Sequence, residues 1–188
     1  MIKVIVNGAR GKMGRTVLQA VSNDKELELV GAVDIKGGMD VGDLIGSAKT
    51  GIIVGENLQT VIDAVKPDVM VDFTRPDAVF DNACLALRNH VSPVIGTTGL
   101  SDEAKDKLND LALAQNTPAF IAANFAIGAV LMMMMAKEAA KYLPNVEIIE
   151  LHHDQKLDAP SGTAITTAEM ISEVRKPINQ GSPAEKEK

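Results

Sequence analysis

The sequence predicts an α/β fold built on a doubly wound parallel sheet. Along the first 125 residues, short apolar runs rich in β-branched side chains alternate with segments of helical spacing. Residues 68–73 are a near-continuous apolar run, which is typical of a parallel strand covered by helices on both faces. The helical segments between strands run to about 10–15 residues, which suits crossover connections. A chain of 188 residues, 46% of them hydrophobic, can build one good core, or one domain and part of another.

A glycine-rich turn follows the first expected strand, residues 2–6. Gly8, Gly11 and Gly14 have a G-x-x-G-x-x-G spacing, and a helical pattern continues from there to about Asn23. In such a turn the first glycine allows the tight bend, the second lets the backbone approach a pyrophosphate, and the third lets helix and strand pack closely. The turn alone is a weak signal, since many glycine-rich turns bind nothing.

The second expected strand, residues 27–33, strengthens this interpretation. It ends at Asp34, 20 residues beyond Gly14. A carboxylate at that position can accept hydrogen bonds from the ribose hydroxyls of adenosine. Together these features indicate a Rossmann-like dinucleotide-binding domain. Lys36 can pair with a 2′-phosphate, so NADH and NADPH are both open as cofactors.

The remaining elements continue the alternation. Residues 37–56 are rich in glycine and are expected to form a long surface excursion. Four successive methionines, residues 132–135, cover all sides of one helical turn, which predicts a helix buried in a sheet or in a subunit interface. We expect helices at 58–65, 77–89 and from Ser101 onward, strands at 68–73, 92–95 and 117–122, and a methionine-rich helix that ends near Tyr142.

Glycines or small polar residues follow four of the expected strands. These ends are residues 8–14, 74–76, 96–99 and 122–125. In a parallel sheet the carboxyl ends of the strands lie along one edge, which is where dinucleotides bind. Their joint placement predicts a dinucleotide site at that edge.

A second cluster of chemically active residues lies between an expected strand, residues 146–151, and an expected helix, residues 163–174. His152, His153 and Lys156 stand close together in the intervening loop. Imidazole titrates near neutrality, and a neighbouring charge can tune a lysine, so these groups can deliver a proton to an atom that receives a hydride. Metal binding is the weaker reading of the two histidines, because no zinc-ligand spacing accompanies them.

The turn at residues 160–163 opens the helix that follows this loop. Backbone N–H groups at a helix start favour an anion, so a carboxylate substrate is plausible there. Ser161 can also simply cap the helix, and the two roles are compatible.

Composition excludes several classes of protein. The formal net charge is −6 and aromatic residues make up only 3%, which argues against nucleic-acid binding. The longest apolar stretch, residues 125–136, is shorter than the ~18 residues of a membrane span. The single cysteine, Cys84, lies in an apolar helical pattern and is expected to be a small buried hydrophobe. His90 is expected to be a surface or capping residue. We expect a soluble, cytoplasmic protein.

Residues 150–164, ELHHDQKLDAPSGTA, closely resemble the signature of the dihydrodipicolinate reductase (4-hydroxy-tetrahydrodipicolinate reductase) family. Residues 7–14, 72–76, 96–99 and 122–128 are similar to the family's other motifs, in the same order and at the same spacings. The resemblance implies a Rossmann-like domain at residues 1–125. It also implies that residues 126–188 are the start of an α+β substrate and oligomerisation domain. This second domain is expected to be incomplete after Lys188, because family members continue through further strands.

The resemblance also implies an activity, namely reduction of a cyclic dicarboxylate imine by NADH or NADPH on the diaminopimelate route to lysine. It implies a homo-oligomer, which is a tetramer in the family, whereas the residue spacing itself gives no reason to expect a metal. By matching position, His152 and Lys156 are the catalytic acid–base residues, and the substrate carboxylates are held by His153, Gly162 and Thr163. The implied cofactor-binding residues are Gly8, Ala9, Arg10, Gly11, Lys12, Met13, Asp34, Gly96, Thr97, Thr98, Ala122, Ala123, Asn124 and Phe125.

Two alternatives to an active reductase remain open. One is a dinucleotide-binding fragment of such a reductase that lacks catalysis. The other, weaker one is a different Rossmann oxidoreductase that acts on another acid. In that case the similarity of the whole motif at residues 150–164 to the reductase family would be a coincidence.

Overall fold

The computed structural model describes residues 1–122, 124–143, 145–152, 154 and 159–176. It divides into two compact units, Met1–Ala122 and Ala123–Lys188. Three residues that the sequence analysis assigns to the site, Ala123, His153 and Lys156, lie outside the described residues.

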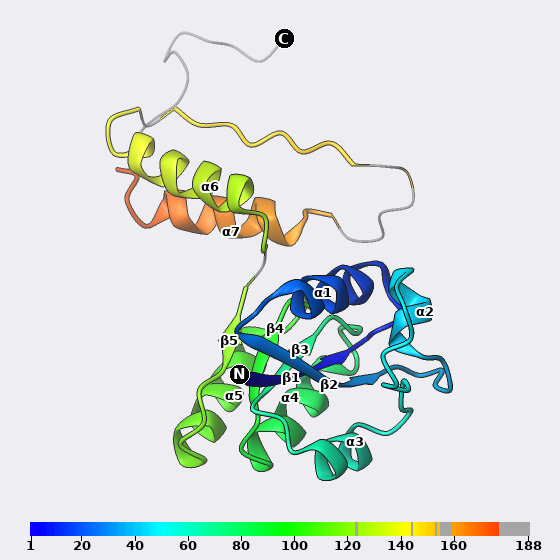
Figure 1. Ribbon diagram of the computed structural model, residues 1–188. Coiled ribbons are helices and arrows are strands. Elements are labelled where there is room, and N and C mark those ends of the chain that lie inside the picture. Colours follow the sequence, from blue (N-terminus) through cyan, green and yellow to red (C-terminus); the bar gives the residue numbers. More distant parts are fainter. Residues whose placement is uncertain (123, 144, 153, 155–158, 177–188) are drawn as a thin grey trace, which may run out of the picture. The chain divides into compact units, whose positions relative to one another are not determined.

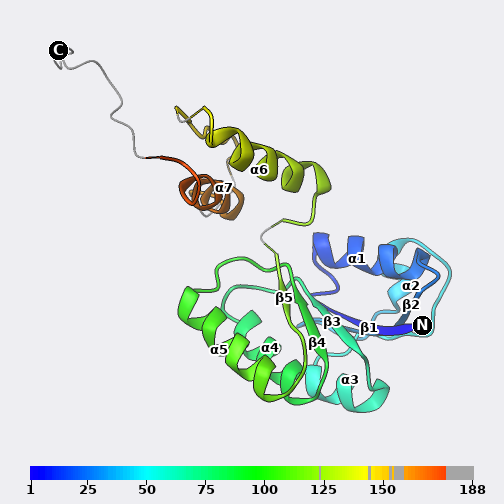
Figure 2. The same cartoon turned by 90° about the vertical axis from the view of Figure 1, so that its left-hand side faces the viewer.

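The first unit is a parallel sheet with helices on both faces (Figures 1 and 2). The strand order is β2-β1-β3-β4-β5, and every neighbouring pair runs parallel. Helix α1 covers one face, whereas α3, α4 and α5 cover the other (Figure 2). The predicted doubly wound α/β fold is confirmed. The strands are β1 (Ile2–Asn7), β2 (Leu27–Val33), β3 (Val69–Asp72), β4 (Ser92–Ile95) and β5 (Phe120–Ile121), and the helices are α1 (Lys12–Asn23), α2 (Val41–Ile45), α3 (Leu58–Val65), α4 (Val79–Arg88) and α5 (Asp102–Ala114).

Apolar side chains on both faces of the sheet hold these layers together. Ile5 and Val6 are neighbours on β1 and therefore point to opposite faces. Ile5 belongs to a buried cluster with Ile62 of α3, and Val6 belongs to another with Leu18 of α1. Both side chains are fully buried, which explains why β1 carries an apolar run and not an alternating pattern.

Two expectations about individual residues near α4 are confirmed. Cys84 is buried in a third apolar cluster with side chains of α4 and α5, and this burial raises the pKa of its thiol. His90 is exposed after the end of α4 and has a left-handed backbone, with a φ of 57°. Neither residue belongs to a reactive cluster.

The expectation that residues 37–56 form only a surface excursion is wrong. This segment contains the short helix α2, and its side chains Val41, Leu44 and Val54 are buried against α1. Val41 and Leu44 have helical spacing, but the helix is only five residues long, too short for a clear periodic signal.

Two expected strands also differ from the structure. Residues 146–151 have no strand assignment, and within the described ranges no neighbouring strand pairs with them. An apolar, β-branched composition fits a strand only where another strand supplies the hydrogen-bond ladder. The strand expected at residues 117–122 is confined to Phe120–Ile121, at one edge of the sheet.

The second unit contains two helices that pack side by side, α6 (Ile127–Ala140) and α7 (Gly162–Ser172) (Figures 1 and 2). Lys137 of α6 forms an ion pair with Glu173, just after α7. Of the four methionines, Met133 is buried, whereas the other three are exposed and Met135 is 67% exposed. The four methionines are therefore not all buried within this chain. Among the described residues, no helix is long and apolar enough to cross a membrane.

The turn between β1 and α1 requires glycine at two positions, one facing the segment after β3 and one facing the turn itself. Gly8 has a φ of +82°, and a Cβ atom there would lie 2.5 Å from the carbonyl oxygen of Phe73. A Cβ atom on Gly14 would lie 2.0 Å from the carbonyl oxygen of Gly8. The start of α1 and the end of β1 therefore meet backbone to backbone, as the spacing predicts.

Substitution of Gly14 by Ala is expected to lower the free energy of unfolding by about 1–3 kcal/mol, because the backbone must shift to admit the methyl group. Gly128 of α6 is a matched control, since a Cβ atom there meets nothing within 4 Å. Gly128→Ala should be neutral or should stabilise by up to about 1 kcal/mol. Chemical denaturation of the two variants tests this, and equal effects would contradict the packing argument.

Asp40 holds the 37–56 segment together through its buried carboxylate. The carboxylate accepts hydrogen bonds from the backbone N–H groups of Gly42, Thr50 and Gly51, at 2.7, 3.0 and 2.9 Å. The hydroxyl of Thr50 donates a fourth, at 3.2 Å. These bonds hold the pKa of Asp40 below its ordinary value, and the bond from the Thr50 backbone N–H has the largest effect.

The lowered pKa of Asp40 predicts a pH-dependent contribution to stability. The contribution is complete above the unfolded-state pKa of about 3.9 and is lost as the pH falls through the lower folded-state pKa. Asp40→Asn should therefore be less stable than the unsubstituted protein at pH 7, and this difference should shrink below about pH 4. Urea denaturation at several pH values measures it. A difference that stays constant down to pH 3 would show that the charge of Asp40 is not involved.

Candidate functional site

The glycine turn in the first unit is bonded to the end of the neighbouring strand. The backbone N–H groups of Gly8 and Ala9 both donate to the carbonyl oxygen of Val33, at 2.9 and 3.0 Å. The N–H of Gly11 donates to the carbonyl oxygen of Gly8 at 3.1 Å. Helix α1 begins after Gly11 with no side-chain cap and no acidic residue in its first turn. Its first N–H groups therefore suit a phosphate.

Asp34 lies directly beside this turn. Its Oδ2 accepts a hydrogen bond from the backbone N–H of Arg10 at 2.8 Å. The guanidinium of Arg10 donates to the carbonyl oxygen of Lys36 at 3.1 Å. A half-buried carboxylate and a guanidinium thus lie together at the end of β2, the first suited to ribose hydroxyls and the second to a 2′-phosphate. Of the other predicted residues here, Lys12 and Met13 are exposed.

The predicted residues after β4 are bound to the end of β3. The N–H of Gly96 donates to the carbonyl oxygen of Asp72 at 2.9 Å, and the hydroxyl of Thr97 donates to the Asp72 carboxylate at 3.1 Å. Thr98 is exposed. The structure thus brings the predicted residues at the ends of β1, β2 and β4 to one edge of the sheet. This edge depends on Asp72, which the sequence analysis did not single out. A carboxylate at the last position of an otherwise apolar strand was the available signal.

The predicted residues 122–125 are divided between the units. The N–H of Ala122 donates to the carbonyl oxygen of Ile95 at 3.1 Å and so extends the first unit. Asn124 belongs to the second unit, where its side-chain amide donates to the hydroxyl of Thr163 at 3.1 Å. Its side-chain oxygen accepts from the N–H of Ala126 at 2.8 Å, just before α6. A residue predicted to bind cofactor therefore contacts a residue predicted to bind substrate. Phe125 is exposed.

Glu150 organises the loop that carries His152. Both oxygens of its carboxylate accept from the backbone N–H of Ser161, at 3.0 and 3.1 Å. The Nδ1 atom of His152 lies 3.8 Å from Oε2 of Glu150. Glu150 therefore joins the histidine segment to the start of α7. In the sequence Glu150 is only the first residue of the motif at 150–164, and no local spacing marks its role.

The start of α7 offers two free donors. The hydroxyl of Ser161 accepts from the N–H of Ala164 at 3.1 Å and caps the helix, as expected. In the part of the chain that the structure describes, no acceptor meets the N–H groups of Gly162 and Thr163. These donors suit a carboxylate, and they lie next to the residue that Glu150 holds.

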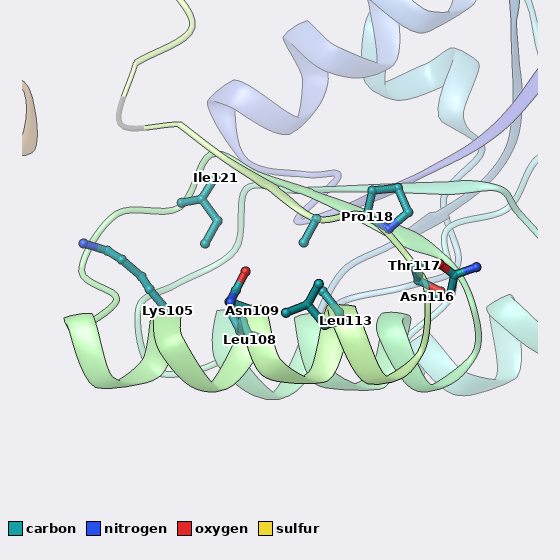
Figure 3. Close-up of a pocket in the computed structure, with 10 residues that line it drawn as sticks. Lys105, Leu108, Asn109, Leu113, Asn116, Thr117, Pro118 and Ile121 are labelled. Atoms are coloured by element: carbon teal, nitrogen blue, oxygen red, sulfur yellow. The ribbon is translucent and has the colours of Figure 1, made fainter.

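A cavity in the first unit lies away from the predicted residues. Among the described residues, no group of three His, Cys, Asp or Glu side chains could hold a metal ion. A cavity of about 560 Å³ lies between α5 and the segment that leads into β5 (Figure 3). Lys105, Asn109, Leu113, Pro118 and Ile121 are among the side chains that line it, and none of the predicted site residues does.

Comparison with known proteins identifies the family of both units. A sequence profile described as "Dihydrodipicolinate reductase, N-terminus" matches residues 2–125, and one described as "Dihydrodipicolinate reductase, C-terminus" matches residues 128–188. The chain is 53% identical to the 4-hydroxy-tetrahydrodipicolinate reductase of Desulfitobacterium hafniense, over all of this chain and 71% of that protein. It is 58% identical to the enzyme of that name from Syntrophomonas wolfei, over 90% of this chain and 64% of that protein.

Solved structures agree with these matches. A dipicolinate-bound dihydrodipicolinate reductase from Paenisporosarcina sp. TG-14 superposes with a TM-score of 0.81 and 49% identity. The match covers all of this chain and 71% of that one. A myo-inositol 2-dehydrogenase from Lactobacillus plantarum, at 13% identity and a TM-score of 0.58, shares only the fold and covers 75% of this chain and 42% of its own. The resemblance expected from the motifs is confirmed, and the chain belongs to the dihydrodipicolinate reductase family.

Proposed function

We propose that this protein reduces 4-hydroxy-tetrahydrodipicolinate to tetrahydrodipicolinate with NADH or NADPH, on the diaminopimelate route to lysine. The observation that carries the proposal is the hydrogen bonding of Glu150, whose carboxylate binds Ser161 N–H and lies beside His152. This bonding supports a role for His152 beside the start of α7, where no acceptor among the described residues meets the N–H groups of Gly162 and Thr163. Membership of the reductase family supports the same reaction.

The residues at the edge of the sheet fit a dinucleotide. The free N–H groups at the start of α1 suit a pyrophosphate, and Asp34 suits the adenosine ribose. When bound, the dinucleotide supplies a hydride to the substrate. Gly8 to Met13, Gly96 to Thr98, and Ala122 to Phe125 are the remaining residues that we assign to it. Ala123 among them lies outside the described residues.

The loop of the second unit manages protons and carboxylates in this proposal. The substrate hydroxyl leaves as water together with a proton from the neighbouring ring carbon, and the ring then gains one hydride and one proton, so that the net reaction consumes one hydride and one proton. His152 and Lys156 hold and transfer the proton, because an imidazole or an ammonium can donate it to the ring as the hydride arrives. His153 and the free N–H groups of Gly162 and Thr163 bind the two carboxylates. The dipicolinate named for the Paenisporosarcina structure is a dicarboxylate of this kind.

A second candidate function is dinucleotide binding without turnover. It is favoured by one observation: residues 146–151, which lead into the histidine loop, have no partner strand within the described ranges. A loop whose preceding segment is not held by a sheet is less well preorganised for catalysis. Parallel measurements of NADH binding and turnover, beside the Desulfitobacterium enzyme, separate the two functions.

We also propose a homo-oligomer in the cytoplasm. Exposed Met132, Met134 and Met135 on α6 support an intersubunit contact, since large apolar side chains gathered on one helix are usually covered. The single cysteine, buried as a thiol, suits a reducing compartment. Sedimentation of the chain, with Met135→Glu as a disruptive variant, tests the assembly.

Lys156→Ala is expected to lower kcat by about 10²–10⁴-fold, because it removes a general acid. NADH affinity should stay unchanged, since the assigned cofactor contacts are elsewhere. Lys141→Ala is the control, because Lys141 is exposed and forms an ion pair with Glu138 within one turn. Steady-state kinetics and calorimetric titration measure the two effects. An unchanged kcat in Lys156→Ala would refute the role of Lys156.

Asp34→Asn and Lys36→Ala are expected to change cofactor preference in opposite directions. Loss of the carboxylate should weaken NADH about tenfold and NADPH less, because a 2′-phosphate is repelled by that charge. Loss of the lysine should weaken only NADPH. Titration of both cofactors, with and without pyridine-2,6-dicarboxylate, gives the comparison. If both variants weaken both cofactors equally, neither side chain reads the 2′ position.

A further inference from the structure

Asp72 is fully buried at the last position of β3, and its carboxylate accepts five hydrogen bonds from described residues. Its Oδ1 accepts from the N–H and the hydroxyl of Thr74, at 2.9 and 2.7 Å, and from the hydroxyl of Thr97 at 3.1 Å. Its Oδ2 accepts from the side-chain amides of Asn7 and Asn82, at 2.9 and 3.1 Å. The donors come from β1, from the turns after β3 and β4, and from α4.

These bonds fix which way two hydroxyl protons point. An ionised carboxylate only accepts hydrogen bonds, so Thr74 and Thr97 must each direct their single hydroxyl proton toward Asp72. The carbonyl oxygen of Asp72, 3.5 Å from the Thr97 hydroxyl, is also only an acceptor. Toward any other partner, the two hydroxyl oxygens can then only accept. Thr74 already accepts from the Asn82 amide at 3.3 Å.

The order of strands places these acceptors beyond the pyrophosphate position. Asp34 lies at the end of β2, and the glycine turn lies at the end of β1. Thr74 and Thr97 follow β3 and β4, the next two strands in the sheet. A dinucleotide whose adenosine lies at Asp34 and whose pyrophosphate lies at α1 extends its nicotinamide riboside half toward these two strands.

We infer that Asp72 is a positioning residue for the nicotinamide riboside half of the cofactor. It holds the hydroxyl of Thr97, and with it that of Thr74, as acceptors for the neutral donors of that half, which are the carboxamide N–H and the ribose hydroxyls. Phosphate oxygens carry no donor and are not favoured there. The inference rests on the proposed function, because it assumes that a nicotinamide dinucleotide binds at this edge.

The test compares binding of three probes by calorimetric titration: NADH, ADP-ribose and ADP. ADP lacks the nicotinamide riboside, whereas ADP-ribose keeps a second ribose but lacks the carboxamide. Asp72→Ala and Thr97→Val should each weaken NADH about tenfold, the usual cost of one well-placed hydrogen bond, and should leave ADP within about twofold. If ADP-ribose weakens with NADH, the ribose is the donor, and if only NADH weakens, it is the carboxamide.

Conservative variants separate positioning from simple structural support. In Asp72→Asn, the backbone N–H of Thr74 cannot reverse, so the amide oxygen is expected to stay at the Oδ1 position and keep both hydroxyls directed inward. The new NH2 group then stands at the Oδ2 position, so the amides of Asn7 and Asn82 must rotate to present their oxygens to it. Asp72→Asn and Thr97→Ser should therefore bind NADH nearly as the unsubstituted protein does. Asp68→Asn is the matched control, since Asp68 is an exposed carboxylate just before β3, at the opposite end of that strand, and accepts from the N–H of Lys3.

Two results would overturn the inference: Asp72→Ala weakening ADP as much as NADH, or Thr97→Val leaving NADH unchanged. If Asp72→Ala does not fold, the NADH affinities of Thr97→Val and Thr97→Ser still test the inference. Loss of NADH affinity in the valine variant, with recovery in the serine variant, supports the inference. Failure of the unsubstituted protein to bind NADH would instead refute the proposed function, and the inference with it.

Discussion

The buried carboxylate of Asp72 is the constraint on which the first half of the site depends. It sits on the central strand, and its hydrogen bonds reach the last residue of β1, the turn after β4 and the first half of α4. Leaving a buried carboxylate without hydrogen-bond partners costs far more free energy than leaving a surface group without them. Moving any of these donors away from Asp72 is therefore unfavourable. The same edge is where Gly8 and Gly14 bring backbones too close for a side chain. The hydrogen bonds to Asp72 and the close backbone packing at Gly8 and Gly14 together hold the strand ends in place without a ligand.

Glu150 plays a comparable part in the second unit. Its carboxylate takes the N–H of Ser161, so the chain before His152 is tied to the chain that begins α7. The Ser161 hydroxyl then accepts from Ala164 N–H, and within the described ranges no acceptor meets the N–H groups of Gly162 and Thr163. In each unit a carboxylate, Asp72 or Glu150, accepts hydrogen bonds from particular donors. The polar groups that it does not bind remain available to a ligand, and they determine the chemistry of that unit.

Local pattern was enough to predict the sheet, its helices and the glycine turn, because strand and helix periods are properties of short segments. It was not enough for features set by distant partners. Asn7 and Asp72 are 65 positions apart, so no local spacing reveals their hydrogen bond. Residues 146–151 have a strand's composition but no ladder in the described part of the chain, and composition cannot say whether a partner exists. In residues 37–56, the buried Asp40 turns a glycine-rich stretch into a folded one through contacts that periodicity does not record.

Hydrogen-bond acceptors and donors alternate along the edge of the sheet. In strand order, the edge offers an acceptor at Asp34, donors at the start of α1, and acceptors at Thr74 and Thr97. A dinucleotide carries the complementary order: ribose hydroxyls that donate, phosphates that accept, and a second nucleoside that donates. A fold alone does not set this order, since the same sheet could carry other side chains at each end. The order arises because carboxylates stand at the ends of β2 and β3, whereas the turn after β1 presents backbone N–H groups at the start of α1, so these three strand ends define the ligand that the edge can accept.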